Sequence, residues 1–171
     1  HYKTMNMQTT SLPKSVESKV QARFPDCDPF NHLNNSKYID YIINTREDHL
    51  MQAYGFDLHQ MARTTGITWV VAQTNISYML PVNCMEMVTI ETRLLTAFPK
   101  MLLMEAVMWN EDKTKVKAMM WCYFAHYNLR SGKSQEHSAE LMTFFDQIGD
   151  PIPENPSFEE RAKFYRNINN N

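Results

Sequence analysis

Residues 24–38 read FPDCDPFNHLNNSKY and connect two regions of different character. Before them, residues 18–24 alternate apolar and polar side chains, a pattern typical of a short strand. After them, residues 35–54 contain no Pro or Gly and are followed by Gly55, a residue type favoured just past a helix end. We expect Asn34 to cap this helix, because its side-chain oxygen can accept a hydrogen bond from a first-turn amide. The loop therefore leads from a strand into one long, largely buried helix.

Four dense segments come after the helix and are rich in Val, Thr, Tyr, Trp and Met. They cover residues 67–80, 85–97, 100–109 and 115–128, with breaks at Pro81, Pro99 and Asn110. This composition between turn residues predicts long antiparallel strands joined by short hairpins. Two C-terminal helices are expected, at residues 138–147 and, exposed to solvent, at residues 157–166. The order strand, long helix, four strands and C-terminal helices predicts an α+β fold.

Length and charge exclude several classes of protein. A chain of 171 residues favours one domain, and 43% hydrophobic with 21% charged residues excludes general disorder. We divide the chain into a loose arm (1–14), a core domain (15–149) and a C-terminal extension with a short helix (150–171). With 17 basic and 19 acidic residues, the net charge of −2 argues against nucleic-acid partners and a polybasic membrane anchor.

The cysteines point to a reducing compartment. Cys27, Cys84 and Cys122 are too few and too scattered for a disulfide framework or a zinc motif. An odd number of cysteines without a secretory leader predicts a cytoplasmic protein. No window approaches 18 uncharged apolar residues, so we expect no transmembrane helix.

The side chains suited to chemistry are concentrated in the first loop. Asp26, Asp28 and His32 precede a helix N-terminus, whose free amides carry partial positive charge. An acid or base beside such amides suits attack on a carbonyl, because the amides can hold the oxyanion that forms. A purely structural interpretation stays open, since Asp and Asn are also common turn formers.

Residues of this loop bear on three other kinds of site. Phe30 and Asn31 occupy a ligand position and the glycine position of an EF-hand loop, which excludes calcium binding of that type. The two aspartates and the histidine could hold another metal, although no second His or Cys cluster supports one. A serine hydrolase lacks its G-x-S-x-G motif, whereas Cys27 with His32 leaves a cysteine nucleophile open.

The loop and the segments after it resemble the hotdog-fold thioesterases, both the 4-hydroxybenzoyl-CoA thioesterase family and the acyl-ACP (acyl carrier protein) thioesterases. The resemblance rests on residues 26–29 (DCDP), residues 32–35 (HLNN) and Tyr38, and continues through residues 69–71 and 88–92. It covers roughly residues 18–130. It implies a hotdog fold, in which a curved antiparallel sheet wraps around one long central helix, here with added C-terminal helices.

The resemblance also implies a reaction and a site. Asp28 matches the family's catalytic carboxylate, as a nucleophile or as a base that activates water. The backbone N–H of Asn35 matches the oxyanion donor, and His32 matches a histidine that orients or polarises the thioester. The implied activity is hydrolysis of an acyl-CoA or acyl-ACP thioester to a free acid and a thiol, without cofactor or metal. Pairing into a homodimer or homotetramer, with active sites between protomers, is also implied.

Two departures from the family pattern are visible. Phe30 stands where many acyl-ACP thioesterases have Asn, and Ile43 stands where many acyl-CoA members carry Glu on the helix. Arg46, by contrast, matches an Arg that is common in the family.

The alternative function is that of a non-catalytic hotdog module that binds an acyl thioester or another apolar ligand. Asp28 favours the enzyme, because a pure binder needs no charge beside a carbonyl pocket.

Outside the loop we expect ordinary roles for the remaining residues. Arg46 interrupts the apolar face of the long helix, and the methionines of the strands are expected in the core. His49, His59 and His137 are expected at the surface.

Overall fold

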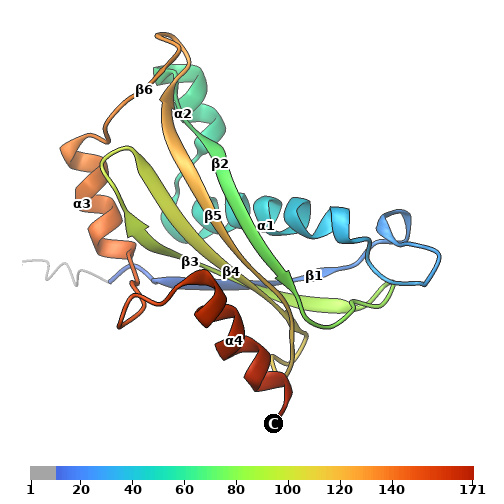
Figure 1. The fold of residues 1–171 in the computed structure, drawn as a ribbon. Helices are drawn as coiled ribbons and strands as arrows, with labels where there is room; N and C mark the ends of the chain where they lie inside the picture. Colours follow the sequence, from blue (N-terminus) through green and yellow to red (C-terminus); the bar gives the residue numbers. More distant parts are fainter. Residues whose placement is uncertain (1–10) are drawn as a thin grey trace, which may run out of the picture.

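A single antiparallel sheet with helices on both faces forms the body of the molecule in the computed structural model, which describes residues 11–171 (Figure 1). Its strands are β1 (Ser15–Gln21), β2 (Ile67–Tyr78), β3 (Met87–Ala97), β4 (Met101–Asn110), β5 (Val116–Asn128) and β6 (Lys133–Ser134). They lie in the order β1-β3-β4-β5-β2, and the short β6 pairs with the end of β5. All pairs are antiparallel, which confirms the predicted α+β hotdog fold.

The first strand and the long helix begin at slightly different residues than expected. β1 begins at Ser15 rather than residue 18, and a 3-10 turn, η1 (Phe24–Asp26), follows it. Residues 1–10 of the predicted arm lie outside the described residues, and the predicted domain boundaries stay predictions. The predicted helix over residues 35–54 is a 3-10 turn, η2 (Asn35–Lys37), followed by α1 (Tyr38–Tyr54). Tightened 3-10 turns are common at helix N-termini.

Both ends of this helical segment have the predicted caps. The Asn34 side-chain oxygen accepts a hydrogen bond from the amide of Ser36 at 3.0 Å, so it caps η2. Gly55 adopts a left-handed φ of 64°, and its amide donates to the carbonyls of Leu50 and Met51. The glycine stops the helix because a left-handed turn costs it no side-chain clash.

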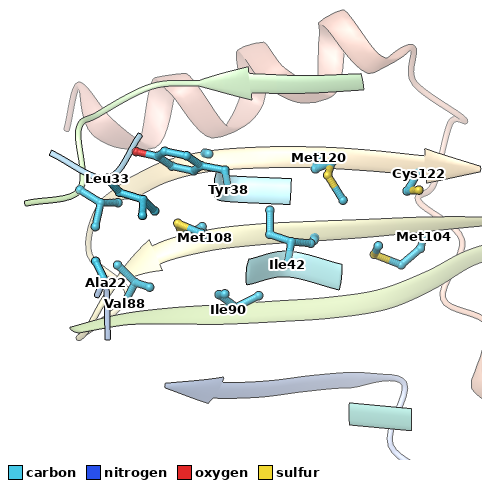
Figure 2. Close-up of a cluster of buried hydrophobic side chains, with 13 residues drawn as sticks. Ala22, Leu33, Tyr38, Ile42, Val88, Ile90, Met104, Met108, Met120 and Cys122 are labelled. Carbon is cyan, nitrogen blue, oxygen red and sulfur yellow. The ribbon is translucent and has the colours of Figure 1, made fainter. Parts of the chain in front are cut away.

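The helix packs on one face of the sheet and closes the main core. Tyr38 and Ile42 project from α1 toward the strands, as Figure 2 shows. The strand residues around them are fully or nearly fully buried: Val88, Ile90, Met104, Ala106, Met108, Ala118, Met120 and Cys122. The methionines of β4 and β5 are therefore core residues, as predicted.

The opposite face of the sheet is covered as well, which corrects one expectation. The last helix, α4 (Phe158–Asn169), crosses this face in front of the strands (Figure 1). It buries Ala162 and Tyr165 against Leu103, Val107 and Trp121, so the predicted exposed helix is wrong. The alternate side chains of β4 and β5 are apolar on both faces, and a sheet of that kind requires cover on both.

Two further helices flank the sheet. The helix α3 (Ala139–Ile148) agrees with the helix predicted over residues 138–147, and its N-cap is Ser138, whose hydroxyl accepts from the amide of Leu141 at 3.1 Å. The helix α2 (Leu58–Thr65) lies between α1 and β2, in a segment for which we predicted no helix. Its ends have ordinary signals, because Asp57 accepts from the amide of Gln60 and Gly66 follows with φ 76°. Among residues 11–171, no helix combines the length and apolar character that crossing a membrane requires.

A chain of buried polar groups joins α1 to the sheet, and it corrects the prediction of a surface His49. Arg46 donates through Nη1 to Thr92 Oγ1 at 3.0 Å, and His49 Nδ1 lies 2.8 Å from the same oxygen. His49 Nε2 lies 2.8 Å from Ser18 Oγ. Both ring nitrogens of His49 have a partner if Thr92 donates to Nδ1 and Nε2–H donates to Ser18, which makes the imidazole neutral. His137 is also buried rather than at the surface, whereas His59 is exposed as predicted.

We expect this neutral histidine to make stability depend on pH. Burial, together with the charge of Arg46, lowers the pKa of His49 to about 4 from its usual value near 6.5. Between these values the unfolded chain binds the proton and the folded chain does not, so stability falls as pH falls. The contribution is about 3 kcal/mol in the free energy of unfolding. Urea unfolding from pH 7 to pH 4 measures it.

His49→Gln supplies the comparison for this measurement. Its free energy of unfolding should decline less steeply over the same pH range, whereas the exposed His59→Gln should follow the wild type. If the free energy of unfolding declined equally with pH in His49→Gln and in the wild type, His49 would not be the group that causes the pH dependence.

Candidate active site

The loop from residue 26 to residue 34 is held rigidly between β1 and α1. The amide of Asn34 donates to the carbonyl of Asp26 at 2.9 Å, which closes the loop on itself. The amide of Leu33 donates to the carbonyl of Val82 at 2.8 Å, which fixes the loop to the segment before β3. Backbone hydrogen bonds of this kind position the side chains of the loop without using those side chains.

Asp28 lies in a tight turn within this loop, and its two carboxylate oxygens differ. Its backbone amide donates to the carbonyl of His32 at 2.8 Å, and Asn31 completes the reversal with a left-handed φ of 65°. Oδ1 accepts from the amides of Phe30 at 2.9 Å and His32 at 3.2 Å. Oδ2 has no hydrogen-bond partner within residues 11–171. The side chain is therefore held by one oxygen and can act with the other.

The other two predicted site residues lie in the same loop and at its end. His32 is half-buried and tied to Asp28 through the two backbone hydrogen bonds just described, and its ring makes none with the described residues. Asn35 is exposed at the start of η2, where its amide has no partner among residues 11–171. No hydrogen bond joins Asn35 to the Asp28 carboxylate in the described chain. The turn thus brings Asp28 and His32 together and presents the Asn35 amide at the helix entrance.

Two aromatic residues stand beside this entrance. The ring of Tyr38 lies edge-on to that of Tyr78 with centroids 5.1 Å apart. The Tyr78 hydroxyl donates to the carbonyl of Asn35 at 3.0 Å, so β2 supports the start of the helix. Burial raises the pKa of both hydroxyls, with the charge of Asp28 a minor contributor at Tyr38. Both hydroxyls therefore stay neutral near pH 7.

The neighbouring Asp26 and Cys27 have structural roles. The hydroxyl of Tyr41 donates to Asp26 Oδ2 at 2.5 Å, which ties the loop to α1. Burial and the nearby Cys84 thiol raise the pKa of Cys27 to about 11, so it is a protonated thiol near neutral pH. A cysteine nucleophile reacts as the thiolate, whereas the Cys27 thiol donates to the carbonyl of Arg23 at 3.3 Å and has no hydrogen bond to His32 in the described residues, so the geometry favours Asp28 over Cys27 as the reacting group. Residues 11–171 contain no group of three His, Cys, Asp or Glu side chains placed to hold a metal ion.

A cavity of about 280 Å³ lies further along α1, between the helix, the sheet and α3. Ile43, Arg46 and Leu50 of α1 form one wall, and most of the remaining wall is apolar and aromatic, including Trp69 and Phe145. Sequence reasoning missed this cavity because its lining comes from segments far apart in the chain. The sequence feature that pointed to this region was Arg46, a charged residue on an otherwise apolar helix face.

Comparison with known proteins agrees with this fold. A family model described as the thioesterase-like superfamily matches residues 22–145. The long-chain acyl-CoA thioesterase FadM of Escherichia coli K12 is 24% identical over 133 residues, which cover 78% of this chain and 98% of FadM.

Solved structures show the same fold. A DHNA-CoA thioesterase from Staphylococcus aureus superposes with a TM-score of 0.69 at 15% identity, covering 78% of this chain and 87% of that one. An oleoyl thioesterase (putative) from Lactobacillus plantarum has a TM-score of 0.70 at 19% identity, covering 84% of this chain and 54% of that one. The family match covers more than half of the chain and includes the whole candidate loop, so this chain belongs to the thioesterase-like superfamily.

Proposed function

We propose that the chain is an acyl thioesterase that hydrolyses an acyl-CoA or acyl-ACP thioester, with Asp28 as its catalytic carboxylate. The family supports thioester hydrolysis as the reaction. One observation carries the assignment to Asp28: two backbone amides hold Oδ1, and Oδ2 has no partner in the described residues. Oδ1 thus fixes the orientation of the carboxylate, and Oδ2 is left available to a substrate or a water molecule.

The proposed reaction follows from this geometry. As a general base, Asp28 Oδ2 takes a proton from water while the water oxygen attacks the thioester carbonyl. As a nucleophile, Oδ2 attacks that carbon itself and water later hydrolyses the resulting anhydride. Either route places negative charge on the carbonyl oxygen, which accepts a hydrogen bond from the Asn35 amide. His32 orients the thioester beside these groups, and the thiolate leaves and takes up a proton.

Assembly into a homodimer, or a tetramer built from it, is part of the proposal. β2 is an edge strand of 12 residues with one side unpaired in the described chain. Val70 and Val71 are exposed on it, and a long apolar edge strand is a template for pairing with another chain. When two copies pair through their β2 strands about a two-fold axis, the strands run antiparallel. The Tyr78 end of β2 in one copy then lies beside the Val71 end of β2 in the other. The candidate loop of one protomer would then adjoin the cavity of its partner.

We expect Val70→Lys to weaken this assembly at least tenfold. In the paired sheet the new ammonium loses water without a partner, whereas in a single chain it stays exposed, so the fold tolerates it. Sedimentation should show the wild type at a multiple of the 20.1 kDa chain and the variant shifted toward a single chain at equal concentration. Leu129→Lys, at an exposed residue after β5, is the control and should assemble as the wild type does. Unchanged assembly of Val70→Lys would exclude the β2 edge.

Thiol release from a panel of short, long and aromatic acyl-CoAs tests the reaction. An enzyme releases thiol from at least one of them with turnover, after subtraction of the protein's own three cysteines. Binding without turnover on acyl-CoA and acyl-ACP alike would indicate the non-catalytic module instead. The cytoplasm remains the predicted location.

A further inference from the structure

Arg46 is a buried cation without a carboxylate partner. Its side chain is 7% exposed, and Nη1 donates to the neutral hydroxyl of Thr92. No Asp or Glu oxygen lies within 4.0 Å of it among residues 11–171, and residues 1–10 contain no Asp or Glu. Arg93 and Arg161, which are half-buried, each pair with carboxylates. Arg46 is thus unusual within its own molecule.

A buried guanidinium without a counterion is unfavourable. Burial lowers the pKa of Arg46 to about 10, with Tyr54 partly offsetting it, so the group stays cationic near pH 7. A guanidinium has five N–H donors, and the Thr92 hydroxyl accepts from one of them. Uncompensated buried charges are rare because desolvation costs several kcal/mol, so a ligand anion is a natural partner.

Arg46 lines the 280 Å³ cavity, whose wall is otherwise mostly apolar. Among the described residues that form the wall, Arg46 is the only basic one. Glu47 also contributes, but its carboxylate is partly exposed and lies 3.3 Å from Nε2 of His59. Glu47 therefore leaves the guanidinium uncompensated. At about 280 Å³, the cavity has room for a chain of several methylene groups.

We propose that this cavity receives the acyl group of the substrate and that Arg46 binds a carboxylate at the end of the acyl group farthest from the thioester. This inference rests on the proposed thioesterase function. The substrate class is then a medium-length acyl thioester with a terminal carboxylate, the monothioester of a dicarboxylic acid. The planar guanidinium fork matches a carboxylate in two parallel hydrogen bonds, and the aromatic wall covers the methylene chain.

The test compares two CoA thioesters of equal carbon number, suberyl-CoA with a terminal carboxylate and octanoyl-CoA with a methyl. We expect the wild type to favour suberyl-CoA in kcat/KM by 10- to 100-fold, the range of a charge-assisted hydrogen-bonded pair. Arg46→Met should lower the suberyl-to-octanoyl ratio by a similar factor. Arg63→Met removes an exposed charge from α2 and should leave the ratio unchanged. Equal ratios for the wild type and Arg46→Met would overturn the inference.

Calorimetric binding of free suberate and octanoate separates this inference from the proposed reaction. If no thioester is hydrolysed but suberate binds the wild type more tightly than octanoate does, the reaction fails and the carboxylate site stands. If octanoyl-CoA turns over as well as suberyl-CoA and suberate has no advantage, the reaction stands and the carboxylate site fails. Both comparisons use the wild type alone, so they hold even if Arg46→Met does not fold.

Discussion

Asp28→Asn should lower kcat for thioester hydrolysis by about 10³-fold while leaving the fold and substrate binding intact. The expected loss follows from removing a general base or nucleophile, which is worth about 10²–10⁴-fold in typical enzymes. An asparagine in this place cannot accept a proton from water or attack a carbonyl. Thiol release under saturating substrate measures the effect.

The structure explains why this substitution isolates the chemistry. Oδ1 of Asp28 accepts hydrogen bonds from the amides of Phe30 and His32, and an asparagine carbonyl oxygen can accept both. The amide nitrogen then replaces Oδ2, the oxygen without a partner in the described residues. The turn should therefore persist, and the free energy of unfolding should change by less than about 1 kcal/mol.

Asp40→Asn is the matched control, because it removes an exposed carboxylate from the first turn of α1. It should hydrolyse as the wild type does. If Asp28→Asn also keeps full turnover, Asp28 is not the catalytic group and the reaction uses another residue. If neither the wild type nor Asp28→Asn releases thiol but both bind the acyl-CoA, the chain is a binding module.

The order of elements could be predicted from the sequence because each has a local signal. The long helix is bounded by Asn34 and Gly55, whose side-chain and backbone preferences act within one turn. The strands are dense in β-branched and aromatic residues between clear breaks. The proximity of Asp28 and His32 could be predicted because both lie in one short loop, which keeps them close independently of the rest of the fold.

Features that depend on distant segments could not be predicted in this way. His49 appears as an ordinary polar residue of a helix, and its burial depends on Thr92 and Ser18, 43 and 31 residues away in the chain. The cavity beside Arg46 likewise exists because α3 returns to α1 after five intervening strands, β2 to β6. The burial of α4 depends on the contact between Arg161 and Glu105 of β4, and the sequence around residue 161 gives no sign of this partner.

Arg161→Met should give the largest loss of stability, because it leaves a buried carboxylate without its main partner. Glu105 is 1% exposed, and Arg161 donates to both of its oxygens at 2.9 Å. Tyr165 and Trp121 add one hydrogen bond each. Removing one member of a buried ion pair typically costs about 3–5 kcal/mol. Urea unfolding at pH 7 measures this difference in the free energy of unfolding.

The matched control lies one helical turn and a half further along α4. Arg166→Met also removes an arginine, but from an exposed position whose guanidinium donates to Ser77 Oγ at 3.0 Å. Its expected cost is below about 0.5 kcal/mol, as for most surface substitutions. The double variant Glu105→Leu with Arg161→Met should recover much of the lost stability, since apolar replacements of a buried pair are often neutral. Equal losses in Arg161→Met and Arg166→Met would show that the Glu105 contact contributes little.

The contribution of Glu105 to the pH dependence of stability should change sign between the wild type and Arg161→Met, whereas the contribution of His49 is the same in both proteins. Burial alone would raise the pKa of Glu105, but hydrogen bonds from Arg161 and Trp121 hold it below its usual value in the wild type. This carboxylate therefore stabilises the wild type above its usual pKa of 4.5, and the contribution is lost as the pH falls through the folded pKa. Without Arg161 the effect of burial dominates, the folded pKa rises, and the folded chain then takes up a proton more readily than the unfolded one. The difference in stability between the two proteins should accordingly shrink as the pH is lowered from 7 toward 5, because protonation removes the buried charge that only Arg93, at 3.6 Å, still pairs in the variant.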